Sequence, residues 1–170
     1  MERRVEALVV GGGLAGLSAA YFLARRGLRP WVLEREAPLS CTSDKSTEAY
    51  RLFWPGDEDL AALVRESLDL LSPFAGVARP NRRGYLYVGR LEALEAMALE
   101  APHAGPLRVH REAATYPKEA ASGLDLLLPG ALGEVFPYLG HLRGLGGLHV
   151  RPAGGLSAQG LGMALLEGLR

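Results

Sequence analysis

The stretch VEALVVGGGLAGLSAAYFLARRGLRPWVLE, residues 5–34, contains three sequence patterns, one after another. An apolar run at residues 5–10 ends at glycine, as a buried parallel strand does. From Leu14 onward, apolar residues recur at helical spacing until a glycine that follows two arginines, which is a helix stop signal. Residues 30–33 then form a second short apolar run that ends at Glu34. The order predicts a strand, a glycine turn, a helix and a second strand, that is, a βαβ unit.

Three glycines in the turn, Gly11, Gly13 and Gly16, form the pattern G-x-G-x-x-G, and each has a physical role. Gly11 permits the tight turn out of the strand, Gly13 lets a pyrophosphate approach the backbone, and Gly16 lets the helix lie close to the strand. Free N–H groups at the helix start, from Leu14 and Ala15 onward, then face the phosphates, aided by the helix dipole. The turn therefore predicts binding of an adenine-containing cofactor.

The acid after the second strand indicates how the adenosine is held. Glu34 lies 21 residues past Gly13, where a carboxylate can accept hydrogen bonds from ribose hydroxyls. The neighbouring Arg35 would instead suit a 2′-phosphate and hence NADP. The motif by itself does not separate FAD from NAD, so an NAD(P)-dependent protein stays open at this point.

Composition limits the other classes of function. The chain has 170 residues, enough for one domain or for part of a larger one, and 48% hydrophobic with 22% charged residues is typical of a globular protein. A formal net charge of zero gives no electrostatic hold on nucleic acid or an anionic membrane. Residues 7–24 carry no charge and resemble a membrane span or a signal segment, but three consecutive glycines would weaken a helix there. We therefore expect no membrane partner, no nucleic acid and a cytoplasmic location.

Residue usage adds two further expectations. Cys41 is the only cysteine, so an internal disulfide is impossible and a secreted disulfide scaffold is excluded. There are 17 Arg against 2 Lys, with a single Asn and a single Gln. Scarce amide side chains favour a thermophilic source, although genomic base composition could give the same bias.

The opening of the chain, residues 9–21 with 33–35, closely resembles that of FAD-dependent oxidoreductases in the D-amino acid oxidase superfamily, particularly the glycine oxidase and sarcosine oxidase group. The resemblance implies that the cofactor is FAD. It also implies that the glycines hold the FAD pyrophosphate and that Glu34 holds the ribose. The substrate implied is a small amine or amino acid.

The resemblance continues past the second strand. Residues 40–47 occupy the place of a polar loop that runs along the FAD, where Thr42 and Ser43 can donate hydrogen bonds, although an ordinary surface loop would have the same composition. In the family an arginine at the position of Arg51 can meet the substrate carboxylate, a task that suits its planar fork. The alternative for Arg51 is a structural ion pair. Glu48 departs from the pattern, since some members have a basic residue there.

The predicted fold is α/β: a Rossmann-like FAD-binding βαβ unit with the start of a mixed α+β substrate domain, together an incomplete enzyme because family members run to about twice this length. We assign residues 1–80 to the FAD-binding domain, 81–148 to the start of the substrate domain and 149–170 to the return to the FAD-binding domain. Local patterns predict a helix at 57–71 capped by Asp57, a strand at 84–88, a helix at 91–99 and a last helix capped by Ser157.

No side chain stands out as a general acid or base, so the catalytic residues are unknown at this point. The four histidines (His103, His110, His141 and His149) are scattered, without cysteine partners or an H-E-x-x-H pattern, so no metal site is expected. Most of them are expected on the surface or in turns. Tyr85 and Tyr87 alternate on one strand and either face a substrate pocket or simply pack.

We therefore expect an FAD-binding component of an oxidoreductase that oxidises an amino acid or a secondary amine. Such a component would need its missing C-terminal half, supplied for example by a second chain, and would be inactive alone; a homo-oligomer is the other possible assembly. The alternatives are a non-catalytic module that binds FAD or a nucleotide, and an NAD(P)-dependent protein. The sequence does not distinguish a natural short subunit from a remnant or a shortened chain.

Overall fold

A computed structural model describes residues 4–43 and 45–169. The chain divides into two compact units. Unit 1 takes its residues from 1–48, 71–80 and 156–170, and unit 2 takes 49–70 and 81–155. The chain therefore leaves unit 1 for unit 2, returns briefly, leaves again, and comes back to unit 1 for its last helix.

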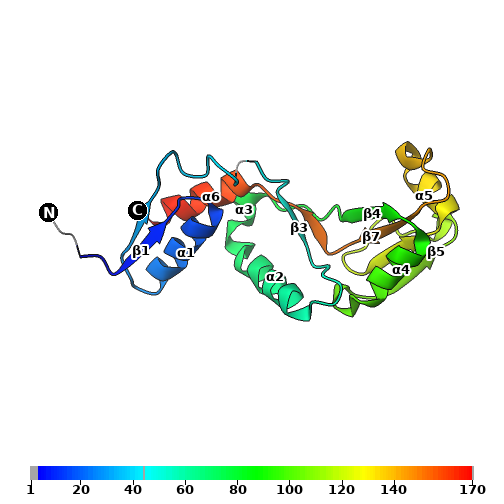
Figure 1. Cartoon of the computed structure of the whole chain (residues 1–170), viewed down its shortest axis with the longest axis horizontal. Coiled ribbons are helices and arrows are strands. Elements are labelled where there is room, and N and C mark those ends of the chain that lie inside the picture. Colours follow the sequence, from blue (N-terminus) through cyan, green and yellow to red (C-terminus); the bar gives the residue numbers. More distant parts are fainter. Residues whose placement is uncertain (1–3, 44, 170) are drawn as a thin grey trace. The chain divides into compact units, whose positions relative to one another are not determined.

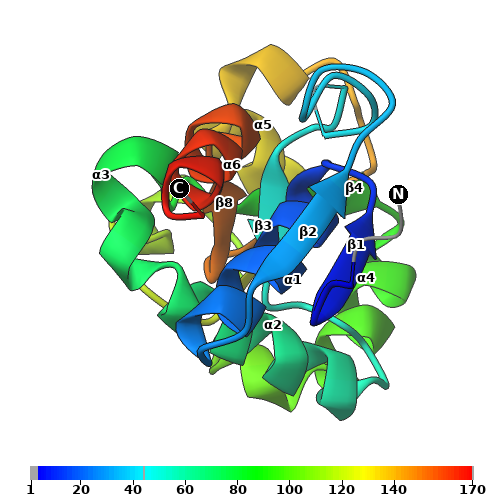
Figure 2. The same cartoon turned by 90° about the vertical axis from the view of Figure 1, so that its left-hand side faces the viewer.

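Unit 1 is a two-stranded parallel sheet with helices packed beside it (Figure 2). Its strands pair in parallel from Ala7 opposite Pro30 to Val10 opposite Leu33, as the βαβ pattern predicts. Buried leucines from three separate segments, Leu17, Leu39 and Leu165 among them, join the first and last helices in one core. The elements are β1 (Ala7–Val10), α1 (Leu14–Arg25), β2 (Pro30–Leu33), the short 3₁₀ helix η1 (Ser72–Phe74), α3 (Ala75–Ala78) and α6 (Ala158–Glu167).

The two strands of unit 1 are half-buried on one face and exposed on the other. Alternate residues of β1 and β2 are exposed, with Val10 at 80% and Leu33 at 51% of their accessible surface. The expectation of a buried first strand is therefore wrong: the inward residues of β1 are half-buried and the alternate ones exposed, because α1 covers only one face of the pair. The exposed face also includes Leu8 and Trp31.

The start of α6 confirms the predicted cap. The Ser157 hydroxyl oxygen accepts a hydrogen bond from the Gly160 N–H at 3.0 Å. A second acceptor comes from Glu48, whose Oε1 atom accepts from the Ala158 N–H at 2.9 Å. A carboxylate at a helix N-terminus is stabilised by the helix dipole, which gives Glu48 a structural role here. Glu48 holds this position with a left-handed backbone, φ +52°.

Unit 2 is built on a four-stranded mixed sheet of order β4-β7-β6-β5 (Figure 1). Strand β7 is antiparallel to both of its neighbours, and β5 and β6 are parallel. A separate antiparallel pair, β3 with β8, also belongs to this unit. The strands are β3 (Ala49–Arg51), β4 (Tyr85–Gly89), β5 (Leu107–His110), β6 (Leu124–Leu127), β7 (Gly146–Val150) and β8 (Ala153–Gly155); the helices are α2 (Glu58–Leu70), α4 (Leu91–Leu99), α5 (Pro129–Val135) and the 3₁₀ turns η2 (Pro102–Ala104), η3 (Ala113–Thr115) and η4 (Pro137–Leu139).

The two faces of this sheet differ in chemistry. On the face covered by α4, Leu124, Leu126, Leu148 and Val150 form the main apolar core. The opposite face, toward α5, receives the alternate residues of the same strands, because side chains alternate along a strand. There Leu127 packs on α5, while polar residues of β5, β6 and β7 form a buried network.

Two helices of unit 2 agree with the sequence patterns. Asp57 caps α2, since its Oδ1 atom accepts from the Leu60 N–H at 2.8 Å, and α4 spans the predicted residues 91–99. Within the ranges 4–43 and 45–169, no helix has both the length and the apolar character needed to cross a bilayer.

Candidate functional site

The glycine turn of unit 1 has the geometry that its sequence requires. Gly11 has φ +104°, a conformation that side-chain-bearing residues rarely adopt, and its N–H donates to the Leu33 carbonyl at 2.8 Å. A Cβ atom added to Gly16 would lie 2.0 Å from the Gly11 carbonyl oxygen. Only glycine fits at residue 16, because the first turn of α1 lies directly against the backbone that leaves β1.

The start of α1 presents backbone donors to an anion. Gly13 is the N-cap and provides no side-chain acceptor, and the first turn contains no acidic residue. The Ser43 hydroxyl oxygen accepts from the Leu14 N–H at 2.9 Å. Over the parts of the chain that the structure describes, the N–H groups of Ala15 and Gly16 have no acceptor. Unpaired N–H groups and the positive end of the helix dipole suit a pyrophosphate.

Glu34 lies beside this turn, at the end of β2, and its carboxylate is exposed. Its Oε2 atom accepts from the Gly12 N–H at 2.6 Å and its Oε1 atom accepts from the Glu36 N–H at 3.0 Å. These backbone hydrogen bonds, first that of Glu36 and then that of Gly12, hold the pKa of Glu34 below its usual value. A carboxylate has about four acceptor positions, so Glu34 can accept from ribose hydroxyls while keeping both backbone bonds.

The other candidate contacts of unit 1 lie on its surface. Arg35 pairs through Nη2 with Glu36 Oε1 at 3.2 Å, and both side chains are largely exposed. Thr42 is exposed, and the structure gives its hydroxyl no partner among residues 4–43 and 45–169. Cys41 carries an exposed thiol. Asp44, in the middle of the polar loop, lies outside the described residues.

Arg51 lies in unit 2, at the end of β3, within a group of aromatic rings. Its guanidinium carbon is 4.4 Å from the centroid of the Trp54 ring and 5.8 Å from that of Tyr85. Burial raises the pKa of Tyr87, although the neighbouring Arg51 cation opposes that shift. The Arg51 Nε atom is buried and has no acceptor among the residues that the structure describes. The alternative of a structural ion pair finds no partner there, since no acid lies within 4.0 Å of Arg51 in the described ranges.

Unit 2 contains a buried polar network that the sequence analysis did not predict. Asp125 is fully buried and accepts from Arg108 Nε at 2.6 Å, from His110 Nε2 at 2.9 Å and from Arg151 Nε. Burial alone would raise the pKa of Asp125, but hydrogen bonds from Arg108, His110 and Arg151 outweigh it and lower the pKa to about 2. The only signal in the sequence is the single acid within the apolar strand at 124–127.

Two of the histidines are not where the sequence analysis expected most of them, on the surface or in turns. His110 and His149 are buried, with 3% and 7% of their surface exposed, so their assignment to the surface or to turns is wrong. Both lie on the face of the sheet toward α5, where alternation along β5 and β7 directs them inward. Across residues 4–43 and 45–169, no group of three His, Cys, Asp or Glu side chains has the arrangement of a metal site.

Comparisons with known proteins identify a family and several similar proteins. The family model described as FAD dependent oxidoreductase, DAO, matches residues 6–170. Aklavinone 12-hydroxylase DnrF from Streptomyces peucetius is 46% identical over 63 residues, which cover 34% of this chain and 13% of that protein.

Solved structures share the fold over almost the whole chain. L-proline dehydrogenase from P. horikoshii has a TM-score of 0.77 at 17% identity, covering 99% of this chain and 42% of the other. Glycine oxidase from Geobacillus kaustophilus also has a TM-score of 0.77, at 18% identity, covering 99% of this chain and 45% of the other. The chain thus spans less than half the length of these two proteins.

Proposed function

The chain belongs to the DAO family of FAD-dependent oxidoreductases, and from this membership we propose that it carries the FAD pyrophosphate and ribose contacts of an enzyme that oxidises an amino acid or a secondary amine. The observation that carries the proposal is the fit of Gly16 against the Gly11 carbonyl, which fixes unpaired N–H groups at the start of α1. The unpaired N–H groups have no acceptor within the described residues, and the oxygen atoms of a bound pyrophosphate would accept hydrogen bonds from them.

Each candidate residue has a defined part in holding FAD. The turn from Gly11 to Gly16, with the unpaired N–H groups of Ala15 and Gly16, would hold the pyrophosphate, and Glu34 would accept from the ribose hydroxyls; the predicted Leu14 N–H already donates to Ser43. Ser43 and Thr42 would add hydroxyl contacts along the cofactor. Because Arg35 pairs with Glu36, we assign it no 2′-phosphate. FAD held by these residues would supply the redox chemistry for oxidation of the substrate carbon next to nitrogen, while the protein binds and orients.

The proposed substrate class rests on two observations. The structural neighbours include proteins named glycine oxidase and L-proline dehydrogenase, which share this fold. Arg51 has a buried Nε donor without an acceptor, in a setting of aromatic rings that holds the guanidinium in place. A substrate carboxylate would satisfy this donor, because a guanidinium pairs with a carboxylate through two parallel hydrogen bonds. We therefore assign Arg51 to the carboxylate of an amino acid.

Because the chain spans 42% and 45% of those two neighbours, we propose that the remainder of the catalytic site comes from further polypeptide. The exposed apolar face of β1 and β2 supports this, since Val10 and Leu33 would be buried in a complete sheet. A cytoplasmic location and a thermophilic source remain predictions from the sequence.

Arg51 gives the proposal a test at the level of substrate. The FAD-loaded chain, with the further polypeptide added, is assayed with an artificial electron acceptor against glycine, N-methylglycine and proline, and against pyrrolidine as an amine without a carboxylate. We expect Arg51→Gln to raise KM for the carboxylate-bearing substrate that bleaches the flavin by roughly 10- to 100-fold, the loss of one charge-assisted pair, with little change in kcat. KM for pyrrolidine should not change.

Arg90, an exposed residue before α4, provides the matched control, because Arg90→Gln removes the same charge away from the Trp54 ring. An equal rise of KM for pyrrolidine in Arg51→Gln would contradict the carboxylate role. Bound flavin that no amine or amino acid bleaches even with the further polypeptide added would contradict the oxidase proposal and favour a non-catalytic FAD-binding module.

A further inference from the structure

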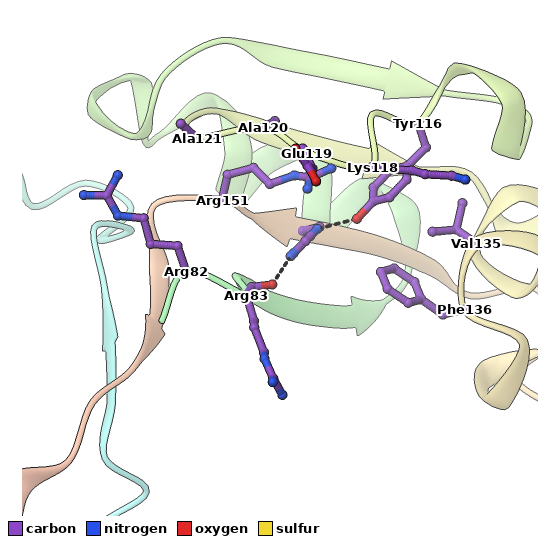
Figure 3. A pocket seen from close by; sticks show the side chains of 11 residues that line it. Arg82, Arg83, Tyr116, Lys118, Glu119, Ala120, Ala121, Val135, Phe136 and Arg151 are labelled. Carbon is purple, nitrogen blue, oxygen red and sulfur yellow. Dashed lines mark hydrogen bonds between the residues drawn. The ribbon is translucent and has the colours of Figure 1, made fainter. Parts of the chain in front are cut away.

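Unit 2 has a pocket of about 650 Å³ on the face of the sheet toward α5, apart from the Arg51 ring group (Figure 3). Its size is within the range of small-molecule sites in proteins. Three of its lining residues, Arg82, Arg83 and Lys118, are exposed cations, against one exposed acid, Glu119. Within the described ranges none of the three cations has a carboxylate within 4.0 Å. Figure 3 shows the Arg82 and Arg83 side chains directed away from Tyr116 and Phe136, so they add positive charge at the rim and Lys118 is the exposed cation beside the aromatic wall.

A fourth cation, Arg151, lies in the wall of the pocket and is only 6% exposed. Its Nε atom donates to Asp125 and its Nη2 atom donates to the Pro117 carbonyl at 2.7 Å. The Nη1 atom has no acceptor in residues 4–43 or 45–169, and it is not among the fully buried unpaired atoms. Arg151 is thus held rigidly by two hydrogen bonds while one of its nitrogen atoms stays available for a ligand.

The remaining wall is aromatic and neutral. The Tyr116 hydroxyl and His149 Nδ1 are 2.6 Å apart, and His149 Nε2 is 3.0 Å from the Arg83 carbonyl oxygen (Figure 3). A carbonyl can only accept, so the proton of His149 is on Nε2 and the Tyr116 hydroxyl donates to Nδ1. Burial lowers the pKa of His149, so the ring is neutral at pH 7.

The aromatic wall is also fixed in position. The Tyr116 and His149 rings are stacked, with centroids 6.1 Å apart, and the Phe136 ring meets His149 edge-on at 6.0 Å. The Arg151 guanidinium carbon is 4.6 Å from the Tyr116 ring centroid. One side of the pocket therefore offers flat apolar surface, and another offers a held guanidinium with exposed cations near it.

We propose that this pocket binds a small organic anion, with its carboxylate or phosphate on Arg151 and Lys118 and its apolar body against Tyr116 and Phe136. The site is independent of the proposed FAD and amine chemistry, since none of its residues belongs to the glycine turn or to the Arg51 ring group. The rigid donor gives direction, and the exposed cations give attraction at longer range.

Calorimetric titration of the full chain with phenylacetate, phenyl phosphate and inorganic phosphate tests the site without flavin. We expect one or both aromatic anions to bind, more tightly than inorganic phosphate and more weakly at high salt. Binding of phenylacetate alone identifies a carboxylate ligand, and binding of phenyl phosphate alone identifies a phosphate ester. Equal affinity for inorganic phosphate and the aromatic anions would overturn the role of the apolar wall.

A charge reversal identifies the site. Lys118→Glu should weaken binding of the aromatic anion by at least about tenfold, because it places a like charge at the pocket. Arg143→Glu makes the same change of charge at an exposed residue of unit 2 outside the pocket, and should leave binding unchanged. Circular dichroism verifies that both variants fold. No binding by wild type at millimolar anion, or equal weakening by the two variants, would overturn the proposal.

Discussion

Replacing Gly16 with alanine is expected to abolish retention of FAD and to destabilise unit 1 by at least about 2 kcal/mol. The added Cβ atom would lie 2.0 Å from the Gly11 carbonyl oxygen, a backbone atom that cannot move without opening the turn. Separating α1 from β1 would also move the N–H groups of Ala15 and Gly16, on which the proposed pyrophosphate contact depends. Both effects are measured on one preparation, by absorbance of retained flavin after desalting and by urea unfolding.

The matched control is Gly76→Ala, also in a helix of unit 1. A Cβ atom at Gly76 meets nothing within 4 Å, and its φ is not in the left-handed region. We expect this variant to be neutral or slightly more stable, with unchanged FAD retention. If Gly16→Ala retained FAD as wild type does, the glycine turn would not be the pyrophosphate site.

Replacing Asp125 with asparagine is expected to destabilise unit 2 by about 3–5 kcal/mol. Asp125 is fully buried and accepts from three cationic or ionisable side chains, of which Arg151 and His110 are themselves buried. The substitution leaves the buried Arg151 cation without its counter-charge and turns an amide N–H₂ group toward donors. Urea unfolding followed by Trp54 fluorescence in a Trp31→Phe background reports on unit 2.

Glu36→Gln provides the control for loss of a carboxylate, because the pair of Glu36 with Arg35 is exposed and should contribute less than about 1 kcal/mol. A loss from Asp125→Asn no larger than that of Glu36→Gln would show that the network is not a main support of unit 2.

His149 and Asp125 determine how the stability of unit 2 changes at acid pH. Burial lowers the pKa of His149, so the unfolded chain binds a proton first and stability decreases as pH falls below about 6.5. The pKa of Asp125 is lowered from 3.8 to about 2, so its stabilisation, about 2 kcal/mol, is present above pH 3.8 and is lost as pH falls toward 2. Asp125→Asn should remove the second decrease and keep the first, measured by unfolding at a series of pH values.

Local patterns in the sequence were sufficient for the part of the fold that local chemistry determines. The βαβ unit, the Asp57 and Ser157 caps and the helix at 91–99 each depend on residues within a few positions of one another. The family and its cofactor followed from the glycine turn and the run after it, which the family match confirms.

Contacts between segments far apart in the sequence could not be predicted from local patterns. Strand β3 has three residues and pairs with β8 about a hundred residues later, so its own sequence carries no periodic signal. The Asp125 network joins side chains from β5, from β6 and from the segment after β7, and no local sequence pattern predicts that these isolated residues meet. The exposure of Val10 depends on what covers the sheet, which the strand sequence does not specify.

The most direct measurement is the visible absorption spectrum of the purified chain, before and after incubation with FAD and desalting, with NADP⁺ as a competitor. We predict retained flavin bands that NADP⁺ does not displace, with weaker retention in Glu34→Gln than in Glu36→Gln. A colourless chain that takes up no FAD, or a flavin that NADP⁺ readily displaces, would contradict the claim that the glycine turn and Glu34 of this chain form an FAD site.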